Sequence, residues 1–133
     1  MRTKSALTAS DAQTIAAACR TEAAKNGWGV SIVVVDDGGN LMHIERLDGA
    51  SILSVDIAIA KARTSALTRR PSKFWEDRVG QSSVYLKFPH IMPLQGGLPV
   101  MHAGECVGGV GIAGRPQASE DEQVATAGVA ALG

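Results

Sequence analysis

Lys61 occupies an unusual setting for a charged residue. It lies within residues 51–68, SILSVDIAIAKARTSALT, which would be apolar on nearly all sides if they formed a helix. Desolvation favours the neutral amine, which can act as a general base or form a Schiff base. The alternative is that Lys61 reaches solvent or pairs with a carboxylate such as Asp48 or Asp56. Lys61 is therefore the candidate catalytic residue, acting as a base or as a charge clamp for an enolate-like oxygen.

The partner of this ammonium group is not evident from its neighbours in the chain. Asp48 precedes Lys61 by thirteen positions, which is about 20 Å along a helix axis. We therefore expect the compensating charge to come from another strand, a loop, a neighbouring subunit or a bound anion, because an unpaired buried ammonium is costly.

Three histidines, His43, His90 and His102, are the candidate metal ligands. Their spacing matches neither a helical metal pair nor a Cys/His zinc cluster, so a structural zinc site is not expected. A single histidine can still bind haem iron where the rest of the site is apolar. His43 and His102 lie in expected strands and are preferred to His90, which lies in an irregular segment. The alternative for each is a satisfied or partly exposed histidine.

Two further groups of residues are candidates for ligand binding. Arg46, Asp48 and Gly49 form the junction between an expected strand and the helix after it, where free N–H groups can bind an anion. The alternative there is that Asp48 caps the helix. The second group comprises glycines in or before expected strands, Gly96, Gly97 and Gly111.

Residues 109–114, GVGIAG, match the letters of GxGxxG. That nucleotide motif must lie in a turn between a strand and its helix, with an acidic residue about 20 positions further on. Here the glycines lie largely inside an expected strand, and Pro116 separates them from the next helix. They indicate close approach of another backbone or of a ligand instead.

The elements that must position these residues follow from the pattern of the chain. Thr8 and Asp11 predict a capping box, and Gly27 a helix end; Ser119 and Glu122 predict a second capping box. The predicted helices cover about 9–26, 51–68, 72–76 (short) and 120–132. The predicted strands cover 30–35, 41–47, 98–102 and 106–113, with a loop or short edge strand within 80–95. We expect a single α+β domain over 1–133, with one antiparallel sheet of four or five strands flanked by three main helices in a profilin-like arrangement.

Composition excludes several classes of protein. The 133 residues are 45% hydrophobic, and 13 basic residues balance 13 acidic ones, so the chain is not a disordered tail and offers no basic field for nucleic acid. The N-terminal residues lack the apolar core of a signal peptide, and no apolar run approaches the ~20 residues of a membrane span. Two cysteines without CxxC spacing, Cys19 and Cys106, fit reduced core residues. We expect a cytoplasmic protein without nucleic-acid or membrane partners.

The sequence resembles the GlcG/HbpS-like family, also called the haem-degrading or DUF336 domain. The matching segments keep their order along nearly the whole chain: VVVDDGG at 33–39, RLDGA at 46–50, IAKA at 59–62, GGLPV at 96–100, VGGVGIAG at 107–114, DE at 121–122 and AG at 127–128. The resemblance implies a profilin-like fold, assembly into homo-oligomers and haem as a possible ligand. His102 directly follows the matching segment 96–100, so it is preferred to His43 as the haem ligand.

Two functional hypotheses remain open. The first is a homo-oligomer of even order that binds haem or a related planar small molecule, since the small-residue strands and the apolar helix leave much surface for one 13.8 kDa chain to cover. The second is a cofactor-independent isomerase, tautomerase or lyase that acts on a small oxygenated metabolite through Lys61.

Overall fold

The first helix begins with the predicted capping box. The computed structural model describes residues 1–132 of the chain. In it the Asp11 N–H donates to the Thr8 hydroxyl (3.1 Å), and the Thr8 N–H donates to the Asp11 carboxylate (2.9 Å). Helix α1 (Ala9–Asn26) ends at Gly27, whose φ of 72° is left-handed. The predicted bounds of this helix are confirmed.

Two hairpins form one antiparallel sheet of four strands. The strands are β1 (Ser31–Asp36), β2 (Leu41–Arg46), β3 (Gly97–His102) and β4 (Glu105–Ala113). Their order across the sheet is β2-β1-β4-β3, so β1 and β4 join the hairpins at the centre. The prediction of one antiparallel sheet is confirmed, with four strands rather than five.

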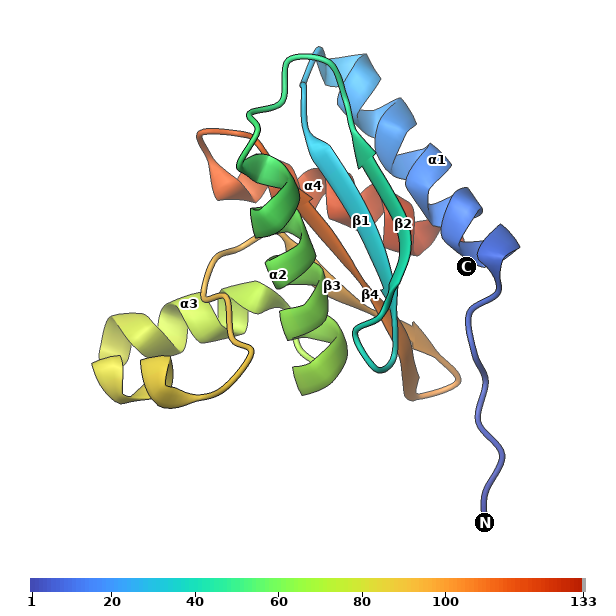
Figure 1. The fold of residues 1–133 in the computed structure, drawn as a ribbon, viewed down its shortest axis with the longest axis vertical. Coiled ribbons are helices and arrows are strands. Elements are labelled where there is room, and N and C mark those ends of the chain that lie inside the picture. Colours follow the sequence, from blue (N-terminus) through green and yellow to red (C-terminus); the bar gives the residue numbers. More distant parts are fainter. Residues whose placement is uncertain (133) are drawn as a thin grey trace.

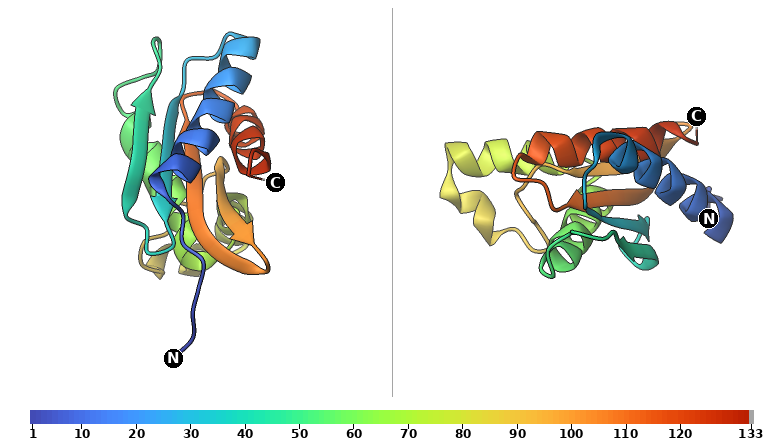
Figure 2. Two further views of the ribbon diagram at one scale, coloured as in Figure 1. Left: turned by 90° about the vertical axis from the view of Figure 1, so that its right-hand side faces the viewer. Right: turned by 90° about the horizontal axis from the view of Figure 1, so that it is seen from above.

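Helices cover both faces of this sheet (Figures 1 and 2). Helix α2 (Ser54–Thr68) packs on one face, while α1 and α4 (Ala118–Ala130) pack on the other. Helix α3 (Ser72–Gln81) and the 3₁₀ helix η1 (Ser83–Lys87) project away from the sheet beside α2 (Figure 1). Among residues 1–132, no helix is both long enough and apolar enough to cross a bilayer.

Three local predictions differ from the structure. Helix α2 begins at Ser54 rather than near residue 51, because residues 52–53 form a turn. Helix α3 has ten residues rather than five, and η1 forms within the segment expected to be irregular, where Trp75 packs against the rings of Phe74, Tyr85 and Phe88. Residues 88–96 form the expected loop, without an edge strand. The predicted capping box of Ser119 and Glu122 is absent, since α4 follows Gln117 and has no side-chain cap.

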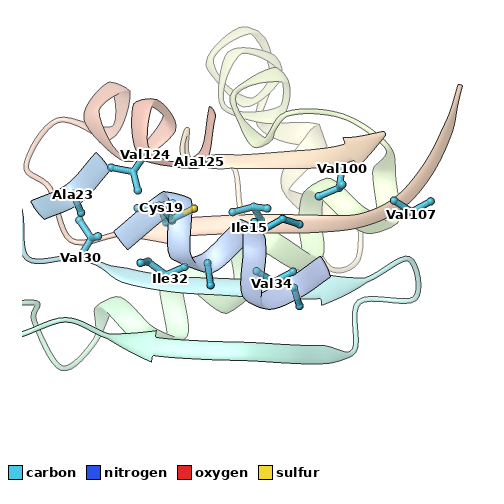
Figure 3. Close-up of a cluster of buried hydrophobic side chains, with 14 residues drawn as sticks. Ile15, Cys19, Ala23, Val30, Ile32, Val34, Val100, Val107, Val124 and Ala125 are labelled. Carbon is cyan, nitrogen blue, oxygen red and sulfur yellow. The ribbon is translucent and has the colours of Figure 1, made fainter. Parts of the chain in front are cut away.

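The core consists of two apolar layers. The larger layer lies between the sheet and helices α1 and α4, and includes Ile15, Cys19, Ile32 and Val124 (Figure 3). The smaller layer lies between the sheet and α2, where alanines of the helix face Val33 and Val35.

The glycines of β4 let α2 approach the sheet very closely. A Cβ atom on Gly109 would overlap the Ala62 carbonyl oxygen, and one on Gly111 would overlap the Ala58 carbonyl oxygen. The GxGxxG letters therefore mark the packing of a helix backbone on a strand, which is one of the two alternatives predicted from the sequence.

Candidate functional site

One pocket lies at the end of the β3–β4 hairpin, and we call it the β3–β4 pocket. It has a volume of about 330 Å³. Its lining joins the N-terminal segment, α1, the hairpin and the end of α4, and consists of Ser5, Ala6, Leu7, Asp11, Val100, Met101, His102, Val107, Val129 and Leu132. The lining thus combines aliphatic side chains with polar groups from separate elements, and its exposed surface is more polar than apolar.

His102 is the histidine that lines this pocket. It is the last residue of β3, opposite Glu105 in the hairpin, and it is exposed. Asp11 also lines the pocket, and the hydrogen bond from the Thr8 backbone holds the pKa of this carboxyl below its ordinary value. The pocket therefore offers an imidazole, the thioether of Met101 and a carboxylate among aliphatic side chains.

His43 lies in a different environment. On β2 it faces Val34 across the ladder, and its Nε2 atom is 3.6 Å from Glu45 Oε1. Glu45 is held by Arg20, whose Nε and Nη2 atoms donate to both carboxylate oxygens, and this hydrogen bonding lowers the pKa of Glu45. His43 lines neither of the two pockets.

His90 lines the second pocket, between α2 and residues 88–92, which we call the α2–loop pocket. Its volume is about 220 Å³, and its lining consists of Ala60, Arg63, Phe88, His90, Ile91 and Met92. The three histidines therefore lie in three different environments of the fold. No group of three or more potential metal ligands occurs within residues 1–132.

Lys61 forms a buried ion pair with Asp121. The two side chains are each 3% exposed, and Lys61 Nζ donates to Asp121 Oδ2 (3.1 Å) and to the Ile112 carbonyl oxygen (3.0 Å). The Arg115 N–H donates to Asp121 Oδ1 (3.1 Å). Burial raises the pKa of Asp121, while Lys61 opposes that shift.

The partner of Lys61 thus comes from helix α4 of the same chain, an element absent from the predicted sources. Lys61 lines neither pocket. Its catalytic role stays a prediction.

The predicted glycines surround this ion pair. A Cβ on Gly96 would lie 2.8 Å from Lys61 Nζ, and one on Gly97 would overlap the Lys61 carbonyl oxygen. Gly96, Gly97 and Gly111 are therefore brought together with Lys61, at the contact of α2 with β3 and β4. The structure explains all three by close packing, and a role in ligand binding stays a prediction.

Arg46, Asp48 and Gly49 lie at and after the end of β2, which forms the opposite edge of the sheet from β3. Their expected position at a helix N-terminus is wrong, because α2 begins five residues later than Gly49, and Asp48 does not cap it. Instead the Asp48 carbonyl oxygen lies 2.6 Å from where Gly29 would carry a Cβ. None of the three lines either pocket.

Several residues of the pockets could not be found from the sequence. Residues 5–7, Val129 and Leu132 reach the β3–β4 pocket from the two ends of the chain, and Arg63 reaches the α2–loop pocket. Each is an ordinary residue in its local sequence. Only the tertiary fold brings them to a cavity.

Comparison with known proteins finds close relatives over nearly the whole chain. The family model described as "Haem degrading protein HbpS-like" matches residues 7–130. Protein GlcG of Escherichia coli K12 is 41% identical over 113 residues, with 84% of each chain covered. An uncharacterised 15.0 kDa protein of Citrobacter freundii is 34% identical over 113 residues, with 81% of this chain and 80% of that protein covered.

Solved structures share this fold over nearly the whole chain. The crystal structure of a double mutant of HbpS from Streptomyces reticuli has a TM-score of 0.93 and 38% identity, and covers 100% of this chain and 91% of that one. The crystal structure described as a PduOC:heme complex has a TM-score of 0.85 and 25% identity, with 96% and 95% covered.

Proposed function

Because this chain belongs to the HbpS-like family of haem-degrading proteins, we propose that it binds haem or a related planar ligand in the β3–β4 pocket. One observation carries this proposal. His102, the histidine chosen from the sequence as iron ligand, lines the larger pocket, where Leu7, Val100 and Val107 supply apolar walls. The complex of the structural neighbour PduOC with haem supports the same ligand class.

The residues that line the β3–β4 pocket fit a haem group. A neutral imidazole is a common axial ligand of haem iron, and a methionine thioether is a second type. His102 would hold the iron, Met101 offers a thioether beside it, and the aliphatic side chains would exclude water from one face of the ring. Bound haem would supply a redox-active iron.

The size of the pocket connects ligand binding to assembly. A volume of about 330 Å³ is at the low end for ligand sites, so a porphyrin would extend past the rim. Large apolar side chains are exposed elsewhere: Ile52 is 83% exposed, Leu53 61% and Leu86 60%. Apolar surface of this kind is typical of interfaces between subunits. We therefore also propose a homo-oligomer of even order, which a sedimentation experiment at micromolar concentration tests; a 13.8 kDa species would contradict it.

The haem proposal is tested by titrating the purified protein with haem and recording the Soret band. His102→Ala is the test variant, and His43→Ala and His90→Ala are the matched controls. We expect a shifted Soret band in the unmodified protein and both controls, and a changed ligand-field spectrum or no binding in His102→Ala. A His102→Ala protein with an unchanged spectrum would overturn the assignment of the ligand.

A further inference from the structure

The α2–loop pocket has a rigid wall formed by residues 90–92. The hydroxyl of Thr64, a fully buried residue of α2, accepts the Met92 N–H (2.8 Å) and lies 3.2 Å from the His90 carbonyl oxygen. The same hydroxyl lies 2.8 Å from the Ala60 carbonyl oxygen. The Met92 N–H therefore attaches the loop to α2, although none of residues 90–92 is buried.

His90 adopts an unusual backbone conformation in this wall. Its φ is +60°, in the left-handed region that residues with a side chain seldom occupy. Such conformations cost free energy and occur where the surrounding structure imposes them, often at ligand-binding segments. Thr64 contacts the carbonyl of this residue, and the His90 side chain lines the pocket.

Arg63 supplies a guanidinium group that is not neutralised by its neighbours. None of the hydrogen bonds or ion pairs found within residues 1–132 involves its side chain. Its stem lies against Gly39 of the β1–β2 turn, where a Cβ would be 3.5 Å from Arg63 Nε. The carboxylates of that turn are used elsewhere: Asp36 accepts from Gly38 and Asn40, and Asp37 pairs with Lys4.

The lining of this pocket contains no acidic residue. Arg63 and His90 stand among Ala60, Phe88, Ile91 and Met92. The pocket is therefore cationic at one side and apolar at the other, unlike the β3–β4 pocket, which contains Asp11. Guanidinium groups bind carboxylates through two parallel hydrogen bonds, and this geometry distinguishes a carboxylate from a neutral group of the same shape.

We propose that the α2–loop pocket binds a small organic carboxylate, with Arg63 binding the carboxylate and Phe88, Ile91 and Met92 contacting its hydrocarbon part. The volume of about 220 Å³ limits the ligand to a short-chain or single-ring acid. This site is separate from the proposed haem site, since the two pockets share no lining residue.

The test uses benzoate as the probe and benzamide, its neutral analogue of the same shape, as the matched ligand control. Binding to the full chain is measured by calorimetry and located by amide chemical shifts in NMR spectra. We expect benzoate to bind at least about tenfold more tightly than benzamide, since hydrogen bonds between charged groups are the stronger ones. The shifted amides should be those of residues 60–63 and 88–92.

Three variants complete the test. Arg63→Gln should weaken benzoate binding at least about tenfold, whereas Arg2→Gln removes the same charge from the N-terminal segment and should leave it unchanged. His102→Ala, which tests the haem site, should also leave benzoate binding unchanged, so failure of one proposal is distinguishable from failure of the other.

Three results would overturn the proposal. They are equal affinity for benzoate and benzamide, undiminished binding by a folded Arg63→Gln protein, and chemical shift changes confined to the β3–β4 pocket. If Arg63→Gln weakens haem binding while benzoate does not bind, the carboxylate recognised is a haem propionate, and the proposal of a separate acid site is wrong.

Discussion

Replacing Lys61 with methionine separates a structural role of this residue from a functional one. Lys61→Met keeps the length of the side chain and removes the charge, which leaves Asp121 buried without its cation. The two charged atoms are 3.1 Å apart and both side chains are 3% exposed. At that distance and an effective dielectric constant of about 20, their attraction is about 5 kcal/mol.

We expect Lys61→Met to lower the free energy of unfolding by an amount of that order. Removing one partner of a buried ion pair typically costs about 3–5 kcal/mol, because the other charge stays desolvated. For a chain of 133 residues this corresponds to a fall in Tm of about 11–18 °C. Thermal and urea denaturation followed by circular dichroism measure both quantities.

The loss of stability caused by Lys61→Met should increase as pH rises. Burial already raises the pKa of Asp121, and loss of Lys61 removes a group that opposes the rise. In the variant, the folded chain therefore keeps a proton on Asp121 at pH values where the unfolded chain has released it. Its stability falls as pH rises from about 4 to the raised pKa, by up to ~1.4 kcal/mol per pH unit. The variant should thus be closest to the unmodified protein near pH 4 to 5.

Asp121→Asn provides the second arm of a double-mutant cycle. Asparagine can still accept the Arg115 N–H, so the double variant lacks the charges but keeps that contact. We expect it to recover at least about 1 kcal/mol relative to the sum of the single losses. If Lys61→Met lowered the free energy of unfolding by less than about 1 kcal/mol, independently of pH, Lys61 and Asp121 would not be a desolvated ion pair. Full stability with loss of haem binding would instead make Lys61 a ligand contact.

Three further predictions follow from local contacts. Gly111→Ala should destabilise the fold by about 1–3 kcal/mol, since its Cβ would overlap the Ala58 carbonyl oxygen, whereas Gly80→Ala has no atom within 4 Å and should not destabilise; urea denaturation compares them. Thr8→Ala should cost about 1 kcal/mol by removing the α1 cap, and Thr8→Ser, which keeps the hydroxyl, should restore most of it. Burial raises the pKa of Cys19 to about 12, so a thiol reagent at pH 8 should label Cys106 alone in the native protein; rapid labelling of Cys19 would contradict its burial.

Features that depend on neighbours in the chain could be predicted from the sequence. The capping box of α1 needs only Thr8 and Asp11, three residues apart. Both hairpins follow from apolar segments on either side of short turns that contain glycine. The glycines of β4 also lie close together in the chain. Because a strand of glycines has little side-chain volume, it predicts that another backbone packs closely against it.

Features that depend on distant residues could not be predicted. Asp121, sixty positions from Lys61, lies in an acidic segment that resembles an ordinary helix start, and nothing local indicates that it points into the core. The capping box of Ser119 and Glu122 fails beside it, because α4 begins one residue before Ser119 and Asp121 faces Lys61. The β3–β4 pocket is likewise formed by elements from both ends of the chain.

The contact of α2 with β4 affects how mutational scans of this fold should be interpreted. Main-chain oxygens of α2 stand where Gly109 and Gly111 would carry a Cβ, so every other amino acid at these positions must displace a helix. In a saturation mutagenesis screen, both glycines should therefore tolerate substitution as poorly as a ligand residue does, because of the helix contact alone. A ranking by intolerance would place them beside His102 or Arg63. Only a screen that records protein abundance separately from ligand binding would tell the helix contact from the sites.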